Sequence, residues 1–132
     1  MDLVTIDGKK YDVLVTNITE TYNILYSEET GRTIADGAPM TLTPIGTFFS
    51  HSITFYRKFG NEKEYDRLYD YLSRPRTEGI AVKIAHNQTT LDYEAYVSTG
   101  ERSLIASNST LNRWGEFTAI FTPMKAQVLP DE

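Results

Sequence analysis

Few side chains in this sequence could carry out acid–base or metal chemistry. The chain has two histidines, His51 and His86, and no cysteine. The lack of cysteine excludes disulfides, thiolate metal sites and thiolate nucleophiles. The two histidines are far apart and form no His-x-x-x-His pair, so a zinc site would need carboxylate ligands as well. We expect His51 either on the same strand face as Ile53 or at the start of that strand, and His86 in a turn. Both are interpreted as surface or strand-edge imidazoles, with neither binding a metal ion.

Paired carboxylates are the next candidates, because glycosidases use two facing acids. Asp92 and Glu94 alternate with apolar residues, which places both acids on the solvent side of a strand, about 6–7 Å apart. Glu28 and Glu29 lie in a stretch without regular pattern. The chain also has no glycine-rich phosphate loop and no Gly-x-Ser-x-Gly motif. We therefore expect no catalytic residue, no metal ion and no cofactor, and a protein that is not an enzyme.

Tyrosines at strand positions offer a different chemistry, the stacking of sugar rings on aromatic side chains. The candidates are Tyr22, Tyr26, Tyr56 and Tyr96. Tyrosines on strands also pack half-buried within sheets, so carbohydrate binding remains an alternative interpretation of these residues.

Composition and charge limit the class of protein. The 132 residues carry 18 acidic and 13 basic side chains, a net charge of −5, and 40% of the residues are hydrophobic. This length and apolar content fit a single domain, residues 1–132, with one core. The acidic balance disfavours a protein that grips nucleic-acid phosphates. No apolar run reaches the roughly 18 residues of a membrane span, so we expect neither membrane contact nor specific nucleic-acid binding.

The elements that must position these residues are mostly strands. Alternating apolar residues predict strands over residues 3–6, 11–15, 17–26, 48–58, 79–85, 91–97 and 114–125. Residues 104–105 add a short apolar patch, and Asp7-Gly8 predicts a hairpin turn between the first two strands. The pattern indicates a mainly β, α+β fold: an antiparallel β-sandwich or barrel of about seven to eight strands.

One segment, residues 62–73, has helical periodicity. Its apolar side chains recur at the i, i+3, i+4, i+7 spacing of an amphipathic helix, and they are Tyr65, Leu68, Tyr69 and Leu72. Asn61 is the expected N-cap and Pro75 limits extension of the helix. We predict that this helix packs on the edge of the sheets and covers the core with its apolar face.

Residues 27–47 form a long irregular loop between two strands. A compact domain seldom carries such a loop without a use for it, and apolar side chains within it are costly to leave in water. We predict that it acts as an assembly arm that becomes ordered on another subunit. The expected contact residues are Arg32, Ile34, Met40, Leu42 and Ile45.

Several motifs follow one another along the chain in a recognisable order. They are IDGKKYDVLV, GRTIADG with IGTFFSHSITFYR, EYDRLYDYLSRP, LDYEAYVSTGERSL and RWGEFTAIFTPMKAQ. In this order, over roughly residues 5–127, they resemble a family of short proteins from the tail modules of tailed phages and prophages. The order of elements is also similar to that of tail-tube and distal-tail proteins, which are β-sandwiches with one flanking helix that assemble as hexameric rings.

The resemblance implies a structural subunit of a phage tail: tube-like, distal-tail-like or an adaptor at the tail tip. Such a protein is made in the host cytoplasm and resides in the virion. Its partners would be further copies of itself in a ring, a hexamer in the similar proteins, and other tail proteins. Two alternatives stay open: a carbohydrate-binding module of a phage baseplate, and a small phage-encoded inhibitor of a host protein.

Overall fold

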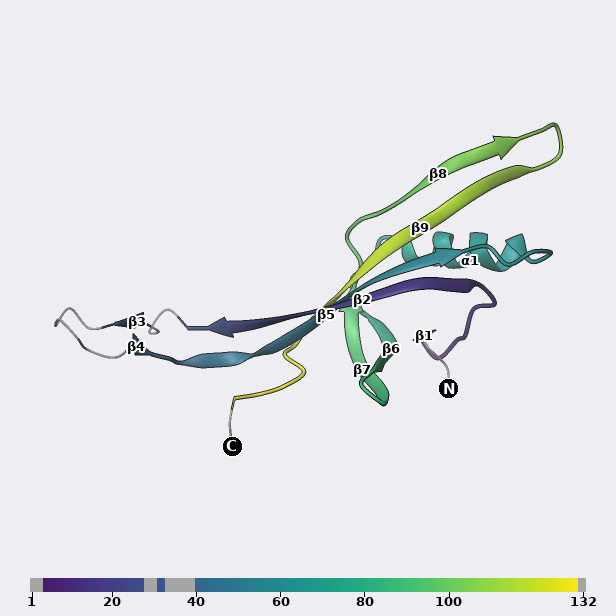
Figure 1. Ribbon diagram of the computed structural model, residues 1–132. Helices are drawn as coiled ribbons and strands as arrows, with labels where there is room; N and C mark the ends of the chain where they lie inside the picture. The colour runs from purple at the N-terminus through teal and green to yellow at the C-terminus, as the bar shows by residue number, and fades with distance from the viewer. Residues whose placement is uncertain (1–3, 28–30, 33–39, 131–132) are drawn as a thin grey trace.

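The computed structural model describes residues 4–27, 31–32 and 40–130 (Figure 1). The elements are β1 (Val4–Ile6), β2 (Leu14–Tyr26), β3 (Gly31–Arg32), β4 (Met40–Thr41), β5 (Pro44–Tyr56), α1 (Glu62–Leu72), β6 (Ile80–His86), β7 (Thr89–Tyr96), β8 (Gly100–Ser107) and β9 (Asn112–Pro123). The predicted fold class is confirmed: this part of the chain is mainly antiparallel β with one short helix, consistent with a sandwich-like or barrel-like α+β fold.

Seven strands form one antiparallel sheet in which β9 is shared between two halves. The order is β1-β6-β7-β9-β5-β2, and β8 pairs with β9 as well. Residues 117–121 of β9 pair with β5, whereas residues 122–123 pair with β7. The β1-β6-β7 half and the half formed by β8, β5 and β2 therefore meet along this one strand.

The core lies between these strands and the helix. Every second residue is buried in residues 51–55 of β5, 80–84 of β6 and 117–121 of β9, as the alternation of a half-buried strand requires. The residues are His51, Ile53 and Phe55, then Ile80, Val82 and Ile84, and then Phe117, Ala119 and Phe121. The helix closes the core with Tyr65, Leu68 and Leu72, all buried, and with Tyr69 packed partly buried against it.

Asn61 is the N-cap residue of the helix, as predicted, but its side chain does not cap the helix. The helix begins at Glu62 after Asn61, but the Asn61 side chain makes no capping hydrogen bond. Its Nδ2 instead donates to Oδ2 of Asp12 at 2.7 Å, and Lys58 donates to the other oxygen of the same carboxylate. A charged acceptor gives a stronger hydrogen bond than a neutral one, which accounts for the outcome.

The first strands pair differently from the prediction. A tight turn does form at Asp7-Gly8, where Ile6 and Lys9 exchange backbone hydrogen bonds of 2.9 Å. However, β1 pairs with β6 rather than with residues 11–15, of which 11–13 are in no strand. Pairing with β6 places both ends of this short strand in the core, which a local hairpin could not do.

The β2–β5 hairpin extends well beyond the rest of the molecule (Figure 1). Its pairing runs from Leu14–Tyr56 to Tyr26–Pro44, while the pairing of β9 with β5 stops at His51. Residues 21–26 and 44–50 therefore form a two-stranded stretch, called the ribbon below. At its far end β3 pairs with β4, Gly31 opposite Thr41.

The predicted loop over residues 27–47 is thus shorter and more regular than expected. Pro44–Thr47 belong to β5, and a proline is tolerated there because it is the first residue of the strand. Residues 31–32 and 40–41 are strand residues too. The sequence pattern did not predict these strand residues, because the stretch contains two prolines and three glycines, which are typical of loops.

Candidate functional site at the root of the ribbon

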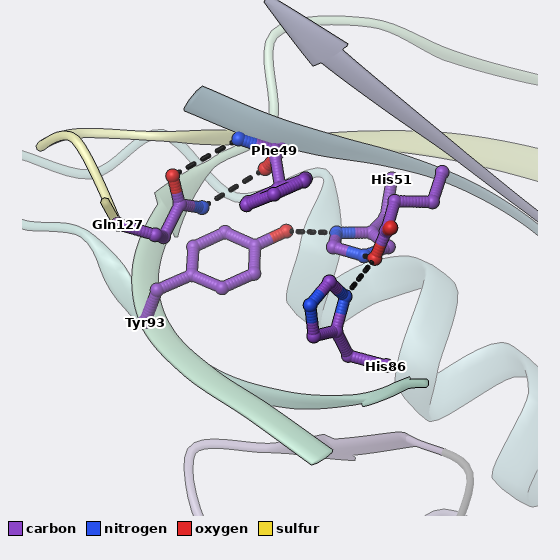
Figure 2. Close-up of polar contacts among 6 residues, drawn as sticks. Phe49, His51, His86, Tyr93 and Gln127 are labelled. Atoms are coloured by element: carbon purple, nitrogen blue, oxygen red, sulfur yellow. Dashed lines mark hydrogen bonds and ion pairs between the residues drawn. The ribbon is translucent and has the colours of Figure 1, made fainter. Parts of the chain in front are cut away.

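Four polar side chains from four strands meet where the ribbon leaves the body (Figure 2). Glu20 comes from β2, His51 from β5, His86 from the end of β6 and Tyr93 from β7. Glu20 and His51 are direct cross-strand partners, and His51 has no solvent exposure. These residues gather at the last position where a third strand supports the β2–β5 hairpin.

The imidazole of His51 is held at both ring nitrogens. Its Nε2 lies 2.9 Å from Oε2 of Glu20, and its Nδ1 lies 2.7 Å from the hydroxyl of Tyr93. A carboxylate only accepts hydrogen bonds, so Nε2–H donates to Glu20 and the Tyr93 hydroxyl donates to Nδ1. This assigns a neutral imidazole, and burial lowers the pKa of His51 in agreement, against the opposing effect of Glu20.

One oxygen of the Glu20 carboxylate accepts hydrogen bonds from both histidines. Its Oε2 also lies 2.6 Å from Nδ1 of His86. Burial pushes the pKa of Glu20 upwards, but the hydrogen bonds from His86 and His51 outweigh this effect and leave the pKa below its usual value. The group is therefore a carboxylate near neutral pH, with an imidazole on each side.

The connectivity of Tyr93, His51 and Glu20 has the form of a hydroxyl–imidazole–carboxylate relay. Its environment does not suit nucleophilic chemistry. Burial raises the pKa of Tyr93 well above its usual value, and the Glu20 charge raises it further. An activated hydroxyl needs the opposite shift and an open approach for substrate, and His51 is wholly buried. The relay is suited to holding strands together.

A second set of contacts fixes the segment after β9 to the same region. The Gln127 side chain accepts from the backbone N–H of Phe49 at 3.0 Å and donates to its carbonyl at 2.9 Å. The backbone N–H of Thr47 donates to the carbonyl of Val128 at 2.8 Å. The ring of Phe49 meets that of His86 edge-on, with centroids 5.0 Å apart. The start of the ribbon is thus clamped from two sides.

Beyond this root the ribbon exposes apolar side chains and carries no charge. Residues 21–26 read TYNILY and residues 44–50 read PIGTFFS, without a charged side chain in either. Tyr22 is 67% exposed and Ile45 is 48% exposed. Ile24, Leu25 and Tyr26 are exposed as well, so both faces of the ribbon present apolar surface. Because β2 is the last strand in the sheet order, its outer edge has no partner strand among the described residues.

The sequence-predicted contact residues fall on or near this ribbon. Ile45 is part of it, and Leu42, 57% exposed, lies just before β5. Arg32 and Met40 lie opposite each other in the β3–β4 pair. Ile34 lies outside the described residues. The helical residues Tyr65, Leu68, Tyr69 and Leu72 face the core and take no part in this site.

The four tyrosines of the carbohydrate hypothesis are not brought together. Tyr22 and Tyr26 share the ribbon, but Tyr56 pairs with Leu14, eight residues from Tyr22 along β2. At roughly 3.3 Å per residue this separates the two by about 26 Å. Tyr96 lies on β7, in the other half of the sheet. No common stacking platform results.

Among the described residues no group of three or more potential ligand side chains is arranged to hold a metal ion. In the same part of the chain, no helix has the length and apolarity needed to cross a membrane. Comparison with protein-family models and with curated proteins finds no match for this chain.

Proposed function

We propose that the protein is a structural subunit of a phage tail that assembles into a ring through its projecting ribbon. The observation that carries this proposal is the uncharged, apolar and two-stranded character of the ribbon. The order of motifs along the chain, which resembles that of tail-module proteins, supports the assignment to a tail. The partners are further copies of the chain and neighbouring tail proteins.

The ribbon is costly to leave uncovered. A two-stranded hairpin alone is marginally stable in water. Burying a large apolar side chain contributes about 1.5–3 kcal/mol, so covering Tyr22, Ile24 and Ile45 on a neighbour would stabilise the assembled state by several kcal/mol before the entropic cost of association.

The outer edge of β2 supports the same proposal. Proteins usually protect an exposed edge strand with charges, proline or a bulge, to prevent pairing with another chain. Residues 21–26 have neither a charge nor a proline, and their Thr, Tyr and Ile side chains favour strands. The one irregularity in their pairing lies at the far end, between Leu25 and Tyr26, and leaves the edge of residues 21–25 regular. An edge of this kind can accept a strand from another copy. We infer that the ribbon meets a different surface on its neighbour, which makes the contact heterologous, the type that forms a ring when its rotation closes.

The proposal is tested by the size of the particles that the purified chain forms at increasing concentration. We expect rings or stacked rings by sedimentation and negative-stain electron microscopy. Tyr22→Lys combined with Ile24→Lys should give folded monomers, because charges on the ribbon prevent its burial. Gln88→Lys, in the exposed β6–β7 turn, is the matched control and should assemble normally. A wild-type chain that stays monomeric at millimolar concentration would contradict the proposal.

A further inference from the structure

The contact between Glu20 and His86 joins two parts of the sheet that are not neighbours. In the strand order β2 and β6 are separated by β5, β9 and β7. The sheet therefore curls until a side chain of the last strand reaches the end of β6. Figure 2 shows His86 pointing towards the carboxylate beside His51, with a dashed line marking their contact.

This contact lies at the position that controls the ribbon. His51 is the last β5 residue paired with β9, and Glu20 is its partner on β2. Beyond these two residues the hairpin pairs with no other named strand, and its remaining support is the segment after β9, where Thr47 forms a bridge with Val128. The contacts of Glu20 and that segment together set the direction in which the ribbon leaves the body.

We propose that Glu20 is the centre of an acid-sensitive latch that fixes the ribbon against the β6–β7 hairpin. One carboxylate holds two imidazoles, His51 and His86, through the same oxygen. The fourth polar member, Tyr93, completes the hydrogen bonding of His51. The remaining side chains shown around the latch, Phe49 and Gln127, carry no charge. The charge balance of the latch therefore depends on Glu20 and the two histidines.

Acid removes the charge that holds these contacts. Near neutral pH the negative carboxylate of Glu20 accepts hydrogen bonds from both imidazoles. When the pH falls through the lowered pKa of Glu20, the carboxylate becomes neutral and these charge-assisted hydrogen bonds are lost. The ribbon is then released from the β6–β7 hairpin. The pKa values of Glu20 and His51 are both lowered in the fold, so the closed latch binds protons less readily than the open one.

The absence of cysteine makes this release measurable with site-specific labels. Spin labels on Leu25→Cys, in the ribbon, and Gln88→Cys, in the β6–β7 turn, report the distance between the two parts. The measurement uses the full chain at a concentration where it is monomeric, so its result does not depend on ring assembly. We expect one narrow distance distribution at pH 7.5 and a broad, longer one at pH 4.

Three variants sharpen the test. Glu20→Ala should give the broad distribution at every pH, and Glu20→Gln, which has no carboxylate to protonate, should give the same distribution at pH 7.5 and pH 4. His86→Gln, at the partly exposed end of the latch, keeps the buried His51 contacts and should broaden the distribution at pH 7.5. Glu101→Gln, on the exposed face of β8, is the control and should behave like the wild type.

Two results would overturn the latch. One is a distance distribution that does not change between pH 7.5 and pH 4 in the wild type. The other is a change that occurs only together with loss of the far-UV circular dichroism signal, because that would be unfolding of the whole domain.

Discussion

The guanidinium carbon of Arg102 lies 3.7 Å from the ring centroid of Tyr69, which joins strand β8 to the helix. The same group lies 4.3 Å from the ring centroid of Trp114 on β9, so the cation is enclosed between two aromatic rings. Tyr69 in turn meets Phe117 edge-on at 5.2 Å. One arginine thus continues the aromatic packing of the core outwards to β8.

Replacing Arg102 should weaken this connection. Cation–π contacts contribute about 0.5–1 kcal/mol when exposed and about 2 kcal/mol when desolvated, and the Arg102 side chain is only 15% exposed. We expect Arg102→Ala to lower the free energy of unfolding by about 1–2 kcal/mol in urea titrations. Arg102→Lys should recover part of the loss, because lysine lacks the flat guanidinium. Asp66→Ala should change little, since its ion pair with Arg102 is at the surface. An equal loss for both alanine variants would contradict this assignment.

Phe117 should be the most costly single truncation on β9. Its ring contacts those of Phe55, Tyr65 and Tyr69 at centroid distances of 5.2, 5.3 and 5.2 Å. Phe117→Ala should therefore cost about 3–5 kcal/mol of stability, measured by chemical denaturation. Ile120→Ala on the outward face of the same strand is the control and should stay within about 0.5 kcal/mol.

The stability of the domain should fall in two steps as the pH is lowered. Burial lowers the pKa of His51 from 6.5, so this residue favours the folded state at neutral pH, and that contribution disappears as the pH falls from 6.5 through the lowered value. Glu20, lowered from 4.5, contributes stability that is lost as the pH falls through its folded pKa. Urea titrations at a series of pH values should show both steps. The lower step should be absent in Glu20→Gln and present in Glu101→Gln.

Gly46 should tolerate no side chain, because the segment after β9 crosses it closely. An added Cβ would lie 2.6 Å from Cβ of Ala126 and 2.9 Å from the carbonyl oxygen of Val128. Gly46→Ala should displace that segment and cost about 1–3 kcal/mol. Hydrogen exchange at the amide of Thr47, which donates to Val128, should become faster. Gly100→Ala is the matched control, since its nearest neighbour would be at 3.5 Å.

The sequence pattern correctly predicted those features of the fold that depend on residues close together in the chain. The 3.6-residue stripe identified α1 and its buried face, and alternation placed Ile53, Val82 and Phe117 in buried positions. β8 was missed because nearly all its side chains are exposed, so they show no alternation, and because its pairing with β9 has two irregularities. The pairing of β1 with β6 was missed because it depends on residues far apart in the chain.

The contacts of the latch could likewise be predicted only in part from the sequence. His51 does share a face with Ile53, but the expectation of a surface or strand-edge imidazole is wrong, because the side chain is wholly buried. Nothing in the sequence pairs it with Glu20, because that contact depends on the register of β2 against β5, and the register changes at an irregularity near Val15. The hydrogen bond to His86 depends further on the curl of the whole sheet.

The narrow junction along β9 has a mechanical consequence. In the described structure β7 joins β9 through two register pairs, Ala95–Pro123 and Tyr96–Thr122, whereas the β2–β5 pairing is long, with two irregularities. A force applied to the tip of the ribbon is therefore transmitted along the paired strands β2 and β5 to the body of the domain. There it acts on the short β7–β9 junction and on the contact between Glu20 and His86. The domain should yield there first, by rotation of its two halves, while the ribbon itself stays intact.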